Sequence, residues 1–162
     1  MKETIKPIRG FYHLQIVDDD GTIAGETEGE NLITESGWGL FIMNQLAGVS
    51  TSASAINAAA LGYHSTYNAN DVSTTMTNIS NQMGARVACA AATVQSSRTI
   101  QLCATFTSGF AGSTATINHI GLFGVSSTTN TPAFALATFA SSTIAANQAV
   151  NMSYSIQFAS HA

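Results

Sequence analysis

The residues that could do chemistry are few and scattered along this chain of 162 residues. The histidines are His13, His64, His119 and His161, and no two of them have metal-ligand spacing or a cysteine nearby in sequence. Catalysis usually gathers several titratable groups in one pocket, but after residue 35 the only acid is Asp71. A Ser-His-Asp set could use His64 and Asp71, yet no Gly-x-Ser-x-Gly turn supports it. We therefore expect no enzyme: no catalytic residue, no metal and no cofactor.

Three consecutive aspartates, Asp18 to Asp20, precede Gly21 and could form a turn or bind Ca²⁺. A Ca²⁺ loop would need its first acidic ligand where Ile16 stands. An Asp-Gly pair between two β-prone runs instead indicates a hairpin with a type I′ turn, in which both central residues have positive φ. The pattern favours the turn.

The charges are concentrated near the N-terminus. Residues 1–35 hold eight acids and three bases, whereas residues 36–162 hold only Asp71, Arg86 and Arg98. Free monomers normally carry many surface charges, and subunit interfaces are depleted of them, so the pattern predicts an assembled protein. The alternative is an exported protein with an uncharged surface of Ser, Thr and Asn. The net charge of −4 argues against a nucleic-acid partner, and no apolar run reaches the roughly 18 residues of a membrane span.

Most of the chain has the pattern of short strands separated by turn-rich clusters. Residues 55–61 could be a buried strand or a helical turn, and residues 64–84 have no clear period and indicate a long loop. In residues 149–158, apolar and polar side chains alternate. The strands are expected at 9–17, 22–27, 85–94, 99–107, 114–125, 133–139 and 149–158.

One segment has helical spacing instead. Trp38, Phe41, Ile42, Gln45 and Leu46 fall at the i, i+3, i+4, i+7, i+8 spacing of one helix face, with Thr34 or Ser36 as the cap. This predicts an all-β fold, a jelly-roll-like β-sandwich with one short amphipathic helix near residues 35–47.

The domain boundary is expected near the start of the chain. We expect an N-terminal arm over residues 1–8 and a single β-sandwich domain over residues 9–162, because Pro7 blocks a ladder hydrogen bond. The arm would either reach a neighbouring subunit or fray.

Several segments resemble small virion proteins of tailed bacteriophages. Residues 29–34, GENLIT, lead into the glycine-containing helix, as in those proteins. Residues 117–123, INHIGLF, are similar to their Ile-x-Glu-x-Gly-Leu-Phe strand, with His119 in place of the acid. The alternating C-terminal strand is also similar.

The resemblance implies a capsid decoration (cement) protein or a tail-associated protein with a jelly-roll-like fold. We expect a structural protein on the surface of the phage head, assembled in the host cytoplasm, that binds the major capsid protein and copies of itself as a homotrimer. No nucleic-acid or membrane partner is expected. The alternative is a receptor- or glycan-binding module of a tail fibre that uses the loop at residues 64–84.

The two cysteines, Cys89 and Cys103, lie in consecutive expected strands. If the hairpin turns about Ser96, they face each other directly, which permits a disulfide without requiring one. A phage protein assembles in a reducing cytoplasm, and free Cys acts as a small hydrophobe. We therefore expect neighbouring, reduced thiols packed in the core.

Overall fold

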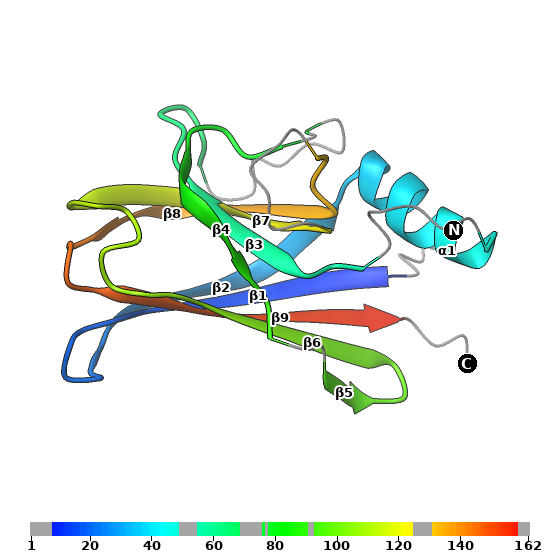
Figure 1. Ribbon diagram of the computed structural model, residues 1–162, viewed down its shortest axis with the longest axis horizontal. Coiled ribbons are helices and arrows are strands. Elements are labelled where there is room, and N and C mark those ends of the chain that lie inside the picture. The colour runs from blue at the N-terminus through cyan, green and yellow to red at the C-terminus, as the bar shows by residue number, and fades with distance from the viewer. Residues whose placement is uncertain are drawn as a thin grey trace, which may run out of the picture.

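The computed structural model describes residues 8–48, 55–68, 76, 78–90, 93–124 and 131–158. Within these residues the chain is all-β with one helical segment (Figure 1). Nine strands form a single antiparallel sheet in the order β4-β3-β7-β8-β2-β1-β9-β6-β5. Their bounds are β1 Ile8–Val17, β2 Ile23–Ile33, β3 Ala58–Gly62, β4 Gln82–Ala88, β5 Thr93–Ser96, β6 Thr99–Phe106, β7 Ala115–Phe123, β8 Ala135–Ile144 and β9 Ala149–Phe158.

The sheet curls into two facing layers because β2 changes partner along its length. Most of β2 pairs with β1, as far as the pair Gly10 and Asn31. The last two residues of β2, Leu32 and Ile33, pair with β8 instead. One layer is therefore β2-β1-β9-β6-β5 and the other is β8-β7-β3-β4, as Figure 1 shows. The all-β prediction is confirmed, and the jelly-roll topology stays a prediction.

The core lies between the two layers. Alternate side chains of β9 point into it, and Val150, Met152, Tyr154 and Ile156 are all buried, as the alternation predicts. The facing layer contributes a second set from β7 and β8, including Ile117, Ile120, Leu122 and Phe139. Each fully buried side chain of this size stabilises the fold by about 1.5–3 kcal/mol relative to an exposed one.

A second, smaller cluster covers the outer face of the β3-β7-β8 layer. Its buried members are Ala58, Ala60, Phe123, Ala133 and Leu136, and the half-buried Met76 and Ile79 pack on them. Every residue of β3 is buried as a result, so residues 58–61 of the ambiguous segment at 55–61 are a strand with both faces covered, and residues 55–57 precede it. Part of the expected long loop is thus a cover for the sheet, and the chain re-enters the sheet at Gln82.

The β1–β2 turn is a three-residue loop, so the expected type I′ turn is wrong. The N–H of Gly21 donates to the carbonyl of Asp18 at 2.9 Å, and the N–H of Asp18 donates to the carbonyl of Thr22 at 2.9 Å. Gly21 has φ +85°, whereas Asp20 does not have positive φ. This is the type I turn with a left-handed glycine that three-residue hairpin loops favour.

The helical segment follows β2 near residues 35–47, as predicted, and contains a π-helix, η1 (Gly37–Met43), followed by α1 (Asn44–Leu46). The hydroxyl of Thr34 caps it by accepting the N–H of Gly37 at 2.8 Å. Phe41 is buried as expected, but Leu46 is 79% exposed, so its predicted place on the buried face is wrong. The i→i+5 bonds of the π-helix change the angular position of later residues, and the helix extends past the sheet in Figure 1.

The arm boundary is shifted by one residue. Ile8, expected in the arm, already belongs to β1 and pairs with Phe158, because it has the ladder N–H that Pro7 lacks. Residues 1–7 lie outside the described residues. In the part of the chain that the structure describes, no helix has the length and apolar character needed to cross a membrane.

The direct pairing of Cys89 with Cys103 is also wrong. The expected long strand at residues 85–94 is split, since β4 ends at Ala88 and β5 pairs with β6 in a different register, Val94 with Ile100. Cys103 pairs with Ser153 of β9. Its side chain is exposed rather than in the core, while Cys89 packs against the core.

Two glycines in the helical segment provide a matched test of its packing. A Cβ on Gly37 would overlap the carbonyl oxygen of Phe134, whereas a Cβ on Gly39 meets nothing. We expect Gly37→Ala to lower the free energy of unfolding by about 1–3 kcal/mol through overpacking. Gly39→Ala should leave it unchanged or raise it by up to about 1 kcal/mol. Urea denaturation measures both, and equal effects would contradict the contact with Phe134.

Candidate functional site

Two of the four histidines meet on the outer face of β7. Asn118 fastens the segment at residues 63–68 there: its side chain donates to the carbonyls of His64 at 2.7 Å and Tyr67 at 3.0 Å, and it accepts the N–H of His64 at 3.0 Å. The Tyr67 ring stacks on His64 with centroids 4.3 Å apart and meets His119 edge-on at 5.4 Å. The cluster thus joins two segments that sequence spacing does not connect.

The chemistry of this cluster is structural. His119 is 2% exposed, and its Nδ1 lies 2.9 Å from Oδ1 of Asn118. Burial, opposed by a backbone hydrogen bond at Ser80 and reinforced by His64, lowers the pKa of His119 to about 4. The His119 ring is therefore neutral near pH 7, closed off from solvent and in contact with Tyr67 of the covering segment.

The other candidate residues do not join this cluster. Asp71 and His161 lie outside the described residues. His13 lies in β1 on the other layer, where its Nε2 is 3.3 Å from Glu26. Among the described residues, no group of three or more His, Cys, Asp or Glu side chains could hold a metal ion.

The three aspartates hydrogen-bond within the β1–β2 turn and to the neighbouring β8–β9 turn. Oδ1 of Asp20 accepts the N–H of Thr22 at 2.8 Å, and this bond lowers the pKa of the carboxyl group. Asp18 accepts the Gln148 amide at 2.7 Å, and Asp19 accepts the Asn147 amide at 3.1 Å. The carboxylates therefore tie the β1–β2 turn to the β8–β9 turn.

Among the described strands, the exposed charges lie on the layer of β1 and β2, and the helical segment adds the exposed Glu35. On β1 and β2, Arg9 makes a bidentate pair with Glu30 at 2.9 and 3.1 Å. On the opposite layer, among the described residues of β3, β4, β7 and β8, the one formally charged side chain is Arg86. It is buried, with its guanidinium 3.5 Å from the centroid of Phe123, and it donates to Thr131. In the residues that the structure describes, the strands of that layer therefore present no charged side chain to solvent.

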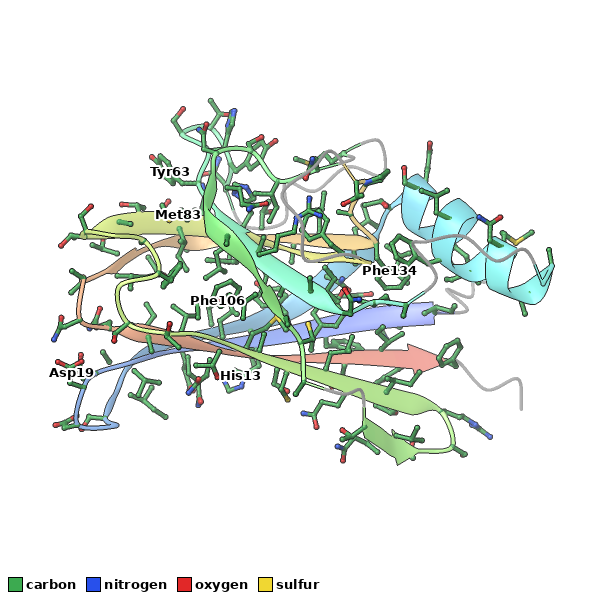
Figure 2. The ribbon with its side chains drawn as sticks, in the orientation of Figure 1. His13, Asp19, Tyr63, Met83, Phe106 and Phe134 are labelled. Atoms are coloured by element: carbon green, nitrogen blue, oxygen red, sulfur yellow. The ribbon has the colours of Figure 1, made fainter. Side chains whose placement is uncertain are left out.

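An apolar surface lies at the helical end of the sandwich. A crevice of about 140 Å³ is lined by Ile8, Phe41, Ile42, Ile56, Ile100, Phe134, Ile156 and Phe158. Phe134 lies between the helical segment and the sheet in Figure 2. Next along the helix, Met43 and Leu46 are 59% and 79% exposed, and Phe158 is 43% exposed at the end of β9. We call Met43, Leu46, Phe158 and this crevice the apolar end surface.

Exposed apolar patches of this kind mark interaction sites. The periodicity of the helix placed Phe41, Ile42 and Leu46 on its buried face, so the sequence did not reveal this surface. The one available signal was Met43, which lies off the predicted buried face.

A polar hollow lies on the outer face of β1, β9 and β6. It measures about 370 Å³, and the side chains that line it include His13, Gln15, Thr105, Asn151 and Ser153. Neighbouring side chains bond across the strands, as in Thr105 to Asn151 at 2.9 Å and Gln101 to Ser153 at 2.6 Å. Figure 2 shows His13 on the side of its layer that faces away from the core. Hydroxyl and amide groups of this kind could bind other neutral polar groups.

No protein-family model, curated protein or solved structure matches the chain. The functional argument therefore depends on the surfaces of the molecule.

The buried His119 predicts a pH dependence of stability. Its pKa falls from about 6.5 in the unfolded chain to about 4 in the folded one, so the unfolded state binds more protons between these values. The contribution of neutral His119 to the unfolding free energy is then fully present above pH 6.5, and it is lost as the pH falls toward 4. From pH 7 to pH 4.5 we expect the His119→Gln variant to lose about 2 kcal/mol less unfolding free energy than the unsubstituted protein. Urea denaturation at both pH values measures this, and identical losses would show that His119 titrates normally.

Proposed function

We propose that this chain is a structural virion protein of a tailed bacteriophage. In this proposal it is a capsid decoration protein that binds the major capsid protein and copies of itself, as a homotrimer, on the surface of the head. The observation that carries the proposal is the apolar end surface, on a chain whose residues 36–162 carry only three formal charges. The resemblance of residues 29–34 and 117–123 to phage virion proteins points the same way.

Docking would work through burial of uncharged surface. Moving Met43, Leu46 and Phe158 out of water contributes about 25 cal/mol per Å² of apolar area. The uncharged β3-β4-β7-β8 layer could enter a subunit contact without the high cost of removing charges from water. A stable contact buries about 1,000 Å² or more, so several such surfaces per copy are needed. This role requires no cofactor and no catalysis.

The position of the charges fits such an orientation. The β1–β2 turn, with Asp18 to Asp20, lies at the end of the molecule opposite the helical segment in Figure 1. If the apolar end surface docks on the shell, the acidic turn points away from it. Like charges on neighbouring particles then repel and keep the particles dispersed.

The second candidate is a receptor- or glycan-binding module of a tail fibre, favoured by the polar hollow around His13, Gln15 and Asn151. The described part of the loop at residues 64–84 includes Tyr67 and Ile79, which pack against β7 and β3, so we assign this role to the hollow instead. Electron microscopy of labelled particles separates the two: regular copies over the head support decoration, and a few copies on the tail support an adhesin.

A pair of substitutions tests the docking surface. Leu46 and Ile23 are both exposed apolar side chains, at 79% and 51%, but they lie on different elements, the helical segment and the start of β2. Leu46→Glu would bury an unpaired carboxylate on docking, and we expect it to weaken binding to capsids lacking the protein at least tenfold. The control, Ile23→Glu, should bind normally. Co-sedimentation with such capsids measures both, and equal binding by the two variants would show that the apolar end surface is not the contact.

A further inference from the structure

The inner face of the five-stranded layer extends past the opposite layer at the helical end of the molecule. Ile156, Ile100 and Val94 are paired across β9, β6 and β5, so their side chains lie on the same face of the layer. Along this row the exposed fraction rises from 5% at Ile156 to 74% at Val94, and Ile100 is half-buried. Phe158, two residues beyond Ile156 on the same face, is also exposed. The apolar face therefore emerges into solvent at the end of the molecule where the helical segment lies (Figure 1).

The crevice of the apolar end surface lies between this face and the helical segment. Every residue that lines it is isoleucine or phenylalanine, so no lining side chain carries a charge or a hydrogen-bonding group. Its volume of about 140 Å³ is close to that of an engineered apolar cavity of about 150 Å³ that holds one benzene ring. The crevice therefore has the size and polarity of a site for one large apolar side chain.

The described part of the chain starts and finishes beside this crevice. Ile8 and Phe158 both line it, and they are paired residues of β1 and β9. Residues 1–7, which lie outside the described residues, join the chain at Ile8 and include two large apolar side chains, Met1 and Ile5. Residues 159–162 include none. Of these two segments, residues 1–7 therefore have the side chains that suit an apolar crevice.

The direction of β1 favours the crevice of a neighbouring copy over that of the same chain. Ile8, Gly10 and Tyr12 face inward from β1, so an extended continuation of the strand directs residue 5 to the outer side. Pro7 favours such a continuation, because its ring fixes φ near about −65° and biases the residue before it to extended conformations. Seven residues reach at most about 25 Å, which is enough to cross from one copy to another in contact with it.

We propose that the crevice binds residues 1–7 of a neighbouring copy, with Ile5 as the side chain that fills it. This inference rests on the part of the proposed function in which copies of the chain bind one another, and it names the contact between them. Met43 and Leu46 do not line the crevice, so they remain available to the shell when the crevice is filled. In a homotrimer each copy gives one segment and receives one, which closes the ring of head-to-tail contacts.

Sedimentation velocity of the full chain tests the contact. We expect the unsubstituted protein to associate into trimers. Ile5→Asp should raise the dissociation constant at least about tenfold, because it would place a carboxylate in a crevice that offers no polar partner. The control, Thr4→Asp, adds the same charge to the same segment and should associate normally. Equal association by the two variants, or an unsubstituted protein that stays monomeric at every concentration, would overturn the proposal.

A cross-link identifies the copy that supplies the segment. Ile5→Cys and Phe158→Cys are combined in a Cys103→Ser background, which removes the exposed native thiol, and the protein is oxidised in its assembled state. We expect a disulfide-linked species of more than one chain, with a peptide that joins positions 5 and 158. A link within one chain, or no link between these positions, would show that a neighbouring copy does not fill the crevice.

Failure of this contact and failure of the proposed function give different results. Trimers that form equally well with Ile5→Asp would overturn this inference and leave the association of copies standing. A monomeric unsubstituted protein would overturn the association of copies as well. Binding to the shell is measured separately, by co-sedimentation of the Leu46 and Ile23 variants with capsids, and neither result changes its outcome.

Discussion

The change of partner along β2 is the constraint on which the rest of this structure depends. A sheet of nine strands that stayed open would leave one apolar face in water, whereas the transfer of Leu32 and Ile33 to β8 folds the sheet over that face. Thr34, the residue after β2, also positions the helical segment. The N–H of Thr34 donates to the carbonyl of Phe134 at 3.1 Å, and its hydroxyl donates to the carbonyl of Ala133 at 2.6 Å. The helix that follows is thereby held across the end of the two layers, which creates the crevice of the apolar end surface.

Folding the sheet over buries its inner faces but leaves β3, β7 and β8 with apolar outer faces. Phe123 and Leu136 belong to that outer cluster, and Met76 and Ile79 cover it. The cover packs closely on β3 because Gly62 has no side chain: a Cβ there would lie 2.6 Å from the carbonyl oxygen of Ser80. His64 and Tyr67 belong to this cover and pack over His119 of β7, which explains why His119 is closed off from solvent.

The sequence predicts strand interiors well and the connections between strands poorly. The alternation at residues 149–158 identifies β9 to the residue, because from Val150 to Ile156 its two faces alternate between the core and the outside, although Phe158 at its end is exposed. The segment AINAAALG gives no such signal, since both faces of β3 are buried and the alternation disappears. The stretch at residues 85–94 contains no strong turn residue at its break, so the separation of β4 from β5, and with it the true place of Cys89, depends on tertiary packing. The prediction that Leu46 is buried was wrong for another reason. Helical spacing identifies an apolar face but does not show whether another element packs against it.

The distribution of charge bears on the proposed docking role, in which the chain would need both repulsion between particles and surfaces suited to burial. Hydroxyl and amide side chains keep the uncharged surfaces wetted, but they lose only about 1–3 kcal/mol on desolvation without a partner, far less than a buried charge. The three acids of the β1–β2 turn lie at the end of the molecule opposite the helical segment, whereas Glu30 near the end of β2 is paired with Arg9. Arg86 is the one charged side chain on the described strands of the β3-β4-β7-β8 layer. It is buried against Phe123, so its charge does not reach the surface of that layer. In the proposed docking role, repulsion by the acidic turn and burial of the apolar end surface would therefore depend on opposite ends of the same small sheet.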